Sequence, residues 1–280
     1  MNQDAVSPQP MGESASIVLA VEHLRKVYKQ KMGDTVAIGD ISLEVKKDEF
    51  VSILGPSGCG KTTLLMCLAG LLTPSAGRVH ISGEVVSSPH PDVTLVFQDY
   101  SRSLYPWLSV SGNVLFGMRQ RQMRPNEKME RARQAIAMVN LQGFEHHFPW
   151  QLSGGMQQRV AIARALAYDP AIILMDEPFA SVDAQTRAGL QDSFLEIWSR
   201  QKKTVLFITH DIEEAIYLSD RIYVISNRPC RVIECLNVNL DRPRRQSITR
   251  QDPSFIEYWR HLFSILEAEQ AQEKQREPLS

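Results

Sequence analysis

The stretch GPSGCGKTT, Gly55–Thr63, restricts the possible fold of this chain more than any other. It fits the pattern G-x-x-x-x-G-K-[ST] and lies between the apolar runs FVSIL and TLLMCLA. Strand, tight loop and helix in this order make a phosphate-binding loop, because glycine lets backbone N–H groups turn inward and a helix start favours anions. We expect Lys61 to reach the β- and γ-phosphates of a nucleotide and the Thr62 hydroxyl to hold Mg²⁺. The predicted cradle comprises Gly55, Pro56, Ser57, Gly58, Cys59, Gly60, Lys61, Thr62 and Thr63.

The composition of the chain limits the class of protein to which this predicted nucleotide site belongs. The 280 residues carry a formal net charge of -1, so charge does not suggest a nucleic-acid partner. Hydrophobic residues make up 43% and charged residues 22%, which is ordinary for a soluble domain with a buried core. No apolar run approaches the roughly 18 residues of a membrane span, and the N-terminus lacks a signal-peptide core. We expect the chain to stay in the cytoplasm, with residues 1–15 as a disordered leader.

Hydrophobic periodicity predicts strands that alternate with helices. Residues 101–165 interrupt the strands with a helical period, so they form a helical insert that includes a helix at Met129–Leu141. Strands alternating with helices predict an α/β fold in which helices cover both faces of a parallel sheet. The predicted strands are Ile17–Val21, Val36–Val45, Phe50–Leu54, Gly77–Ile81, Val93–Phe97, Ala171–Asp176, Thr204–Thr209 and Arg221–Ser226.

Polar side chains stand at the ends of three predicted strands. Asp176 ends the strand IILMD, and its carboxylate suits Mg²⁺, directly or through water. Glu177 follows at once and points differently, so it can orient and polarise an attacking water molecule. Gln98 and His210 end two other strands, and His210 can touch the γ-phosphate. Because the carboxyl ends of parallel strands meet at one edge, we expect these groups in the same crevice as the phosphate loop.

A second anion-binding helix start lies in the insert, at LSGGMQQR, Leu152–Arg159. Ser153 and two glycines precede the helical run VAIARALA. One phosphate needs no second loop from the same chain, so we expect this edge to serve the nucleotide of another copy. A symmetric pair would then bury ATP between the phosphate loop of one chain and the Ser-Gly-Gly edge of the other.

The octet LSGGMQQR resembles the signature sequence of ABC ATPases. The order of motifs agrees as well: phosphate loop, Gln98, signature, LMDEP, Asp183 and His210. The resemblance covers about Val18–Ile233 and implies a P-loop NTPase domain at 16–240. By it, the sheet core is mostly parallel with antiparallel strands at the N-terminal side, and the helical subdomain lies near 101–165. Residues 241–280 form a linker and an amphipathic helix beyond this domain.

The resemblance also implies roles for individual residues. Tyr28 resembles the aromatic residue that stacks on adenine, Gln98 the residue that senses the membrane partner, and Asp183 the acid that couples paired sites. The loop before Asp183 reads Ser181-Val182-Asp183 where the family usually has Ala-Leu-Asp. The implied contacts to the nucleotide of the opposite copy come from Ser153, Gly154, Gly155 and Gln157. Catalytic roles are expected for Glu177, His210, Lys61 and Gln98. Metal-binding roles are expected for Thr62, Gln98 and Asp176.

One ATPase unit without membrane spans resembles the separate ATPase subunit of bacterial importers. The segments VFQDYSRSLYPWLSVSGNV and QLSGGMQQRVAIARALAYDP look most similar to the nitrate, sulfonate and taurine importer group. This likeness implies ATP, Mg²⁺, a homodimer, a transmembrane permease and, indirectly, a solute-binding protein. It also implies uptake of a small anionic solute and a peripheral place on the cytoplasmic face of the inner membrane. Two alternatives stay open: a non-transport ABC ATPase of DNA repair or translation, and a binding module switched by ATP without turnover.

Three local features each have two interpretations. Cys59 is either a small residue that fits the loop or a thiol whose modification blocks the enzyme. Trp107, in Tyr105-Pro106-Trp107, belongs to the core or lines a groove for a permease helix. Asp252 and Pro253 predict the start of an amphipathic helix that packs on its own domain or on a partner subunit. The apolar residues of that helix are Phe255, Trp259, Leu262 and Leu266.

Overall fold

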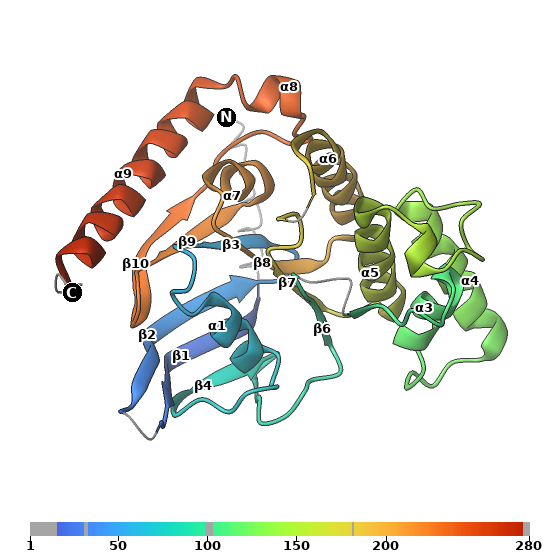
Figure 1. The fold of residues 1–280 in the computed structure, drawn as a ribbon, viewed down its shortest axis with the longest axis horizontal. Helices are drawn as coiled ribbons and strands as arrows, with labels where there is room; N and C mark the ends of the chain where they lie inside the picture. Colours follow the sequence, from blue (N-terminus) through green and yellow to red (C-terminus); the bar gives the residue numbers. More distant parts are fainter. Residues whose placement is uncertain (1–15, 31–32, 99–102, 181, 277–280) are drawn as a thin grey trace, which may run out of the picture.

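The computed structural model describes residues 16–30, 33–98, 103–180 and 182–276. The described strands form one sheet, and helices lie on both of its faces (Figure 1). The helical insert lies to the right of the sheet in this view, and the C-terminal helix crosses its upper left side. The predicted leader and Ser181 lie outside the described residues.

The N-terminal part of the sheet is antiparallel. Strand β1 (Ile17–Tyr28) pairs with β2 (Thr35–Lys46) on one side and with β4 (Ala76–Ile81) on the other. The short strand β5 (Glu84–Val85) pairs antiparallel with β4 and forms the edge of the sheet. This part matches the antiparallel strands that the family resemblance implies.

The central part of the sheet is parallel and carries the phosphate loop. Strand β3 (Phe50–Leu54) lies between β8 (Thr204–Thr209) and β9 (Arg221–Ile225), and all five of its residues are buried. The order continues through β7 (Ile172–Asp176) to β6 (Val93–Val96) at the far edge. Because all five strands run in one direction, their carboxyl ends share one edge, as the sequence predicts.

Strand β10 (Cys230–Asn237) joins the two parts of the sheet. It pairs antiparallel with β9 and parallel with β2. Hydrophobic periodicity does not predict this strand, because Arg231 and Glu234 break up its apolar pattern. Alternate residues of β10 are exposed, and Ile233 and Cys235 are among them, so apolar and polar residues do not alternate regularly along it.

The helices also follow the predicted order, with small differences in their bounds. In the insert, α4 begins at Pro125 rather than Met129, because proline is favourable at the first helical position. It ends at Met138 rather than Leu141, and Asn140 just beyond it adopts a positive φ of 56° that reverses the chain. The described helices are α1 (Lys61–Leu68), α3 (Val110–Gly117), α4 (Pro125–Met138), the short 3₁₀ helix η1 (Pro149–Gln151), α5 (Gly154–Tyr168), α6 (Ala184–Gln201), α7 (Ile212–Leu218), α8 (Gln246–Thr249) and α9 (Pro253–Arg276).

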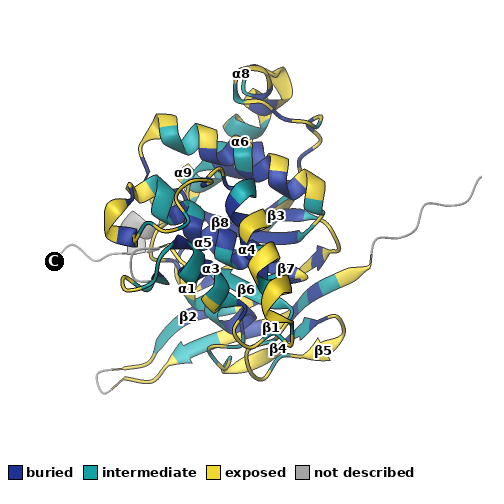
Figure 2. Ribbon diagram, turned by 90° about the vertical axis from the view of Figure 1, so that its right-hand side faces the viewer, coloured by how far each residue is buried: buried dark blue, intermediate teal, exposed yellow. Residues whose placement is uncertain are grey.

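The core has two layers, one on each face of the sheet. Successive residues of a strand point to opposite faces, so Val51 packs with α1 whereas Phe50 packs with α6. The ring of Phe50 lies 5.7 Å from the ring of Trp198 and 6.0 Å from that of Phe194. Figure 2 shows the buried central strands between partly exposed outer helices. None of the described helices is both long and apolar enough to cross a bilayer.

The basic segment 241–252 is not a free linker, because its arginines bind the preceding domain. Arg244 is 6% exposed, and it donates hydrogen bonds to the carbonyl oxygens of Ile216, Tyr217 and Ser219 at the end of α7. A cation is favourable there, since the last carbonyls of a helix carry partial negative charge. Arg242 pairs with Asp220, and its guanidinium lies over the ring of Trp198 at 4.3 Å. The expected linker is therefore packed against the domain, and residues 241–252 are called the C-terminal strap.

The C-terminal helix α9 packs on its own chain. Phe255 and Leu262 are buried in the same core as α6 and α7, and Trp259 and Leu266 pack against its edge. The Asp252 carboxylate accepts a hydrogen bond from the Ser254 N–H at 2.8 Å, as the predicted cap requires. His261 of the helix lies 2.8 Å from the Glu234 carboxylate of β10. Of the two interpretations, packing on its own domain is therefore confirmed.

A buried carboxyl group connects α7 with the C-terminal strap. Glu214 accepts a hydrogen bond from Gln191 of α6 at 3.0 Å, and Gln191 in turn accepts one from Gln246 of α8. Burial raises the pKa of Glu214 to about 7, and the neighbouring charge of Asp211 adds to this effect. Hydrogen bonds from Thr209 and Gln191 and the charge of Arg187 oppose the increase.

Stability should fall as pH rises because of Glu214. Between its ordinary pKa of 4.5 and its folded pKa of about 7, the folded state keeps a proton that the unfolded state releases. We expect Glu214→Gln to gain roughly 2–3 kcal/mol in unfolding free energy relative to the parent between about pH 5 and pH 8. Urea unfolding across this range measures the difference. Parallel stability curves for the two proteins would contradict the assignment.

Candidate nucleotide site

The phosphate loop follows β3 and depends on glycine at two left-handed positions. Gly58 has a φ of +78° and Gly60 a φ of +125°, conformations that strain other residues. A Cβ atom on Gly60 would lie 3.0 Å from the Ala37 carbonyl oxygen and 3.3 Å from the Cys230 sulfur. Both the conformation and the close neighbours therefore require glycine at residue 60.

Lys61 crosses the loop from the first turn of α1. It is 5% exposed, and its ammonium donates hydrogen bonds to the carbonyl oxygens of Gly55 and Pro56 at 2.9 and 2.8 Å. The same nitrogen lies 3.3 Å from Glu177 Oε1. A buried ammonium needs such partners, since an unpaired charge away from water is costly. The lysine thereby joins the loop to the end of β7.

Two side-chain oxygen atoms that can ligate a metal lie together beside the loop. Thr62 Oγ1 donates a hydrogen bond to Asp176 Oδ2 at 2.9 Å. Burial raises the pKa of Asp176 and the charge of Glu177 adds to this, whereas the bond from Thr62 and the charge of Lys61 lower it. The described residues contain no group of three or more His, Cys, Asp or Glu suited to a metal. The pair fits Mg²⁺, which commonly takes one or two protein oxygens and completes its shell with phosphate and water.

Glu177 is the point where the three strand ends converge. Its φ of +41° turns the chain sharply after β7, which explains why its side chain departs from the strand direction. Glu177 Oε2 accepts hydrogen bonds from Gln98 Nε2 at 3.3 Å and from His210 Nδ1 at 2.9 Å. His210 is half exposed, whereas Glu177 is mostly covered. The structure thus brings Gln98, Glu177 and His210 together with Lys61.

Tyr28 lies beside the start of α1, on the other side of the loop. Its hydroxyl is 3.3 Å from Thr63 Oγ1, and its ring is partly exposed. Lys26 Nζ lies 5.5 Å from the centre of the ring. An exposed aromatic ring next to a phosphate loop can stack on a nucleotide base.

The signature segment caps α5, away from the phosphate loop. Ser153 Oγ accepts a hydrogen bond from the Met156 N–H at 3.3 Å, and both Ser153 and Gly154 are exposed. The amide of Gln157 instead braces its own chain, because it donates to the carbonyl oxygens of Pro149 and Leu152. Figure 1 shows α5 and α1 well apart, on opposite sides of β7.

Asp183 stands at the start of α6, the helix that follows β7. Its carboxylate accepts a hydrogen bond from the Thr186 N–H at 3.0 Å and so caps α6, and this bond lowers its pKa. A Cβ atom on Gly155 would lie 3.0 Å from Thr186 Cγ2. The small residue at 155 therefore lets the start of α5 approach the start of α6.

Trp107 is not a core residue. It is 70% exposed, and its ring contacts that of Tyr105 at 5.4 Å. Tyr105 is in turn held by Asn113, which accepts a hydrogen bond from its N–H and donates one to its carbonyl oxygen. The interpretation of Trp107 as core is wrong, whereas its contact with a partner stays a prediction.

One side chain that contacts the loop, Arg228, is not apparent from the sequence. Arg228 Nη2 donates a hydrogen bond to the Gly58 carbonyl oxygen at 2.7 Å. The two residues are 170 positions apart in the chain, so no local pattern connects them.

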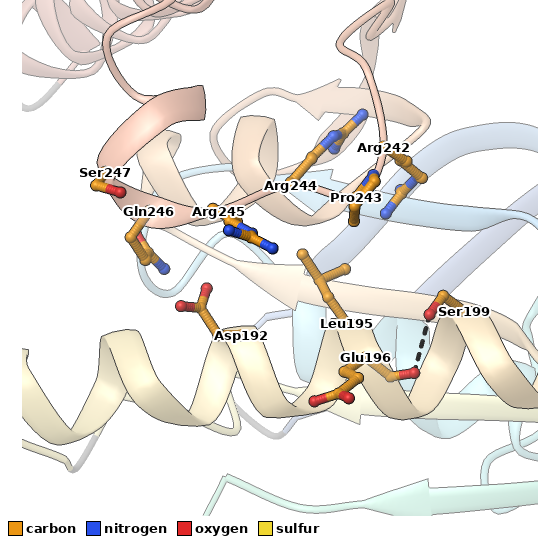
Figure 3. Close-up of a pocket in the computed structure, with 10 residues that line it drawn as sticks. All are labelled: Asp192, Leu195, Glu196, Ser199, Arg242, Pro243, Arg244, Arg245, Gln246 and Ser247. Atoms are coloured by element: carbon orange, nitrogen blue, oxygen red, sulfur yellow. Dashed lines mark hydrogen bonds between the residues drawn. The ribbon is translucent and has the colours of Figure 1, made fainter.

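A separate cavity of about 580 Å³ lies between α6 and the segment 242–247 (Figure 3). Arg245 and Asp192 extend into the space between the helix and this segment. None of the residues predicted for nucleotide chemistry lines this cavity. It therefore does not belong to the site at the strand ends.

Comparison with known proteins decides the family. A family model described as ABC transporter matches residues 38–180. The chain is 49% identical over 253 residues to an uncharacterised ABC transporter ATP-binding protein of Methanocaldococcus jannaschii, covering 90% of this chain and 92% of that protein. The chain belongs to the ABC transporter family of ATPases. The predicted family, its α/β P-loop fold and ATP binding are thus confirmed.

Relatives of this ABC ATPase include named import proteins. It is 38% identical to a nitrate import ATP-binding protein of Synechocystis, over 91% of this chain and 97% of that protein. It is 45% identical to a taurine import ATP-binding protein of Yersinia pestis, over 79% of this chain and 87% of that protein. A dimeric ATP-binding cassette solved with ADP and phosphate matches with a TM-score of 0.69 and 33% identity, over 79% of this chain and 98% of that one.

The thiol of Cys59 should react slowly. Burial raises its pKa, and burial raises the pKa of Cys67 to about 11 and of Cys230 to about 12. Cys235 is exposed. We expect a maleimide at neutral pH to modify Cys235 first and Cys59 at least roughly tenfold more slowly, because the thiolate is the reactive form. A time course by peptide mass spectrometry measures both rates, and equal rates would contradict the small-residue interpretation.

Proposed function

We propose that this chain is the ATP-hydrolysing subunit of a bacterial importer that takes up a small anionic solute through a separate permease. The observation that carries the proposal is the position of Glu177, whose carboxylate lies within reach of Lys61, Gln98 and His210. Such an arrangement suits hydrolysis, because a carboxylate held beside the phosphate loop can receive a proton from water. A module that only bound ATP would need no such group.

In the proposed reaction, Glu177 orients water for in-line attack on the γ-phosphate. His210 donates to Glu177 Oε2 and so holds the carboxylate toward the phosphate, while Gln98 contacts the same oxygen. Lys61 leaves its loop carbonyls for the β- and γ-phosphates, whose negative charge it partly neutralises. Thr62, Asp176 and Gln98 would hold Mg²⁺, which supplies charge stabilisation to the phosphates when bound.

A second copy would complete the site. Ser153 caps α5, whose first N–H groups favour an anion, yet α5 lies apart from α1, the helix that follows the phosphate loop (Figure 1). The resemblance to a dimeric cassette bound to ADP and phosphate supports a homodimer. In the proposed homodimer, Ser153, Gly154 and Gly155 contact the partner's nucleotide. Asp183 caps α6, whose Thr186 lies against Gly155 of the signature, and this position suits the proposed coupling of the two sites.

The importer assignment rests on the relatives. Their names, nitrate import and taurine import ATP-binding proteins, support a permease partner, an indirect solute-binding protein and a peripheral place at the cytoplasmic face of the membrane. The alternative, an ABC ATPase of DNA repair or translation, receives no support from the insert, whose helices α3, α4 and α5 pack together rather than extend as a coiled coil.

Replacement of Glu177 tests the hydrolytic role. We expect Glu177→Gln to bind ATP but to lose roughly 10²-fold or more in turnover, because the amide cannot accept the proton. The bound ATP should trap a dimer, which gel filtration detects beside phosphate release. Lys61→Ala is the matched comparison, since it should lose ATP affinity instead. Near-normal turnover in Glu177→Gln would remove the proposed role.

Replacement of Trp107 tests the permease contact. We expect Trp107→Ala to keep ATPase activity in solution but to reduce solute uptake in proteoliposomes that contain the permease, because an exposed aromatic anchor is lost. Met129→Ala, a change at another exposed apolar residue of the same insert, is the control. Uptake equal to that of the parent would exclude Trp107 from the contact.

A further inference from the structure

The turn between β9 and β10, residues 226–229, lies between the phosphate loop and the C-terminal helix. On one side, Arg228 Nη2 donates to the Gly58 carbonyl oxygen at 2.7 Å. On the other side, Asn227 holds Glu269 of α9 twice. Its backbone N–H donates to Glu269 Oε2 at 3.2 Å, and its side-chain amide donates to the Glu269 carbonyl oxygen at 2.8 Å. Two adjacent residues thus connect α9 to the loop.

The bond from Arg228 controls the direction of one peptide group in the loop. In a trans peptide the C=O and the following N–H point in opposite directions. When Arg228 holds the Gly58 carbonyl on the outside of the loop, the Cys59 N–H is directed to the other side, where a phosphate-binding loop presents its donors. Gly58 is at a left-handed φ, and apart from its chain neighbours no atom lies within 4 Å of its Cβ position, so packing at that position does not restrain this peptide.

Charge strengthens the effect of this contact. A guanidinium is always ionised and forms stronger hydrogen bonds than a neutral donor. By polarising the Gly58 carbonyl, it makes the N–H on the opposite side of the same peptide a better donor to an anion. The positive charge of Arg228 also lies next to a loop that is suited to phosphates, so it favours binding of the negatively charged nucleotide beyond the direct contact.

The turn itself is fixed on both sides. Ser226 and Asn227 are buried, and Ser226 Oγ accepts a hydrogen bond from the Arg231 N–H across the turn at 3.1 Å. The helix that Asn227 holds is anchored by Phe255 and Leu262 in the core. A shift of α9 along its axis would therefore move Asn227 and, with it, the neighbouring Arg228.

We propose that Arg228 is a further positioning residue of the ATP site and that the C-terminal helix sets its place through Asn227. The inference rests on the proposed function, because it requires that the phosphate loop binds a nucleotide. Arg228 acts on the loop and not on the water that attacks ATP. Its effect should fall on nucleotide affinity, for ADP as well as ATP, and not on turnover at saturation.

The first experiment compares two neighbouring arginines. We expect Arg228→Ala to raise the Kd for ATP and for ADP roughly five- to twentyfold, with kcat at saturating ATP within about twofold of the parent, as for loss of a charged hydrogen bond. Arg228→Lys should recover part of the affinity, because one donor and the charge remain. Arg231→Ala is the control, since the Arg231 side chain is exposed and has no hydrogen bond with the described residues.

The second experiment tests the connection to α9. Asn227→Ala should also raise the Kd for ATP and for ADP, but by a smaller factor than Arg228→Ala. Combined with Arg228→Ala it should raise the Kd little further, because both changes act through the same contact between Arg228 and the loop. Unchanged affinity in Arg228→Ala, or a loss of kcat without a change in KM, would overturn the positioning role. Fully additive effects in the double variant would overturn the connection to the helix.

Lys61→Ala separates failure of this inference from failure of the proposed function. Loss of ATP affinity in Lys61→Ala together with unchanged affinity in Arg228→Ala rejects the role of Arg228 alone. Retained affinity in Lys61→Ala rejects the nucleotide site itself, and the role of Arg228 with it.

Discussion

The contact between Lys61 and Glu177 joins the two segments on which the rest of the site depends. One residue belongs to the loop after β3 and the other to the end of β7, with β8 between these strands. The buried ammonium donates to the loop carbonyls and pairs with this carboxylate, so the carboxylate is held close to the loop. Gln98 and His210 then bind the same carboxylate from the strands on either side. The sheet order thereby sets the chemistry, because each strand contributes one polar group at a common edge.

Much of this site could be predicted because its residues lie in short local patterns. The loop carries its glycines and lysine within nine positions, and Asp176 and Glu177 end a hydrophobic strand. Because parallel strands end at the same edge of a sheet, the meeting of these residues can be predicted without knowledge of the strand order. The positive φ of Glu177 could not be read from its residue type, yet it determines where the carboxylate points. The exposure of Trp107 also needed the structure, since an aromatic residue between apolar neighbours fits a core or a surface equally well.

Long-range contacts account for what the sequence did not show. Arg228 reaches Gly58 only because β9 lies beside β3, and Arg244 finds the carbonyls at the end of α7 only after the strap folds back. Basic residues between prolines are typical of a solvated linker, and their pattern is the same when each guanidinium has a buried partner. The helix that begins at Pro253 was clear from its spacing and cap, whereas its attachment through Asn227 and Glu234 was not.

The place of β10 has a consequence for how the chain is made. Ile38 in β2 pairs with Cys230 in β10, so in the described sheet β2 is joined to the central strands by pairing with a segment far along the chain. During synthesis, β1, β2 and β4 can pair with one another early, but the edge of β2 stays open until β10 leaves the ribosome. Strand pairings between residues so far apart in the sequence form slowly. Until then an unpaired strand edge is available to other chains, and a chaperone that covers it would serve this protein well.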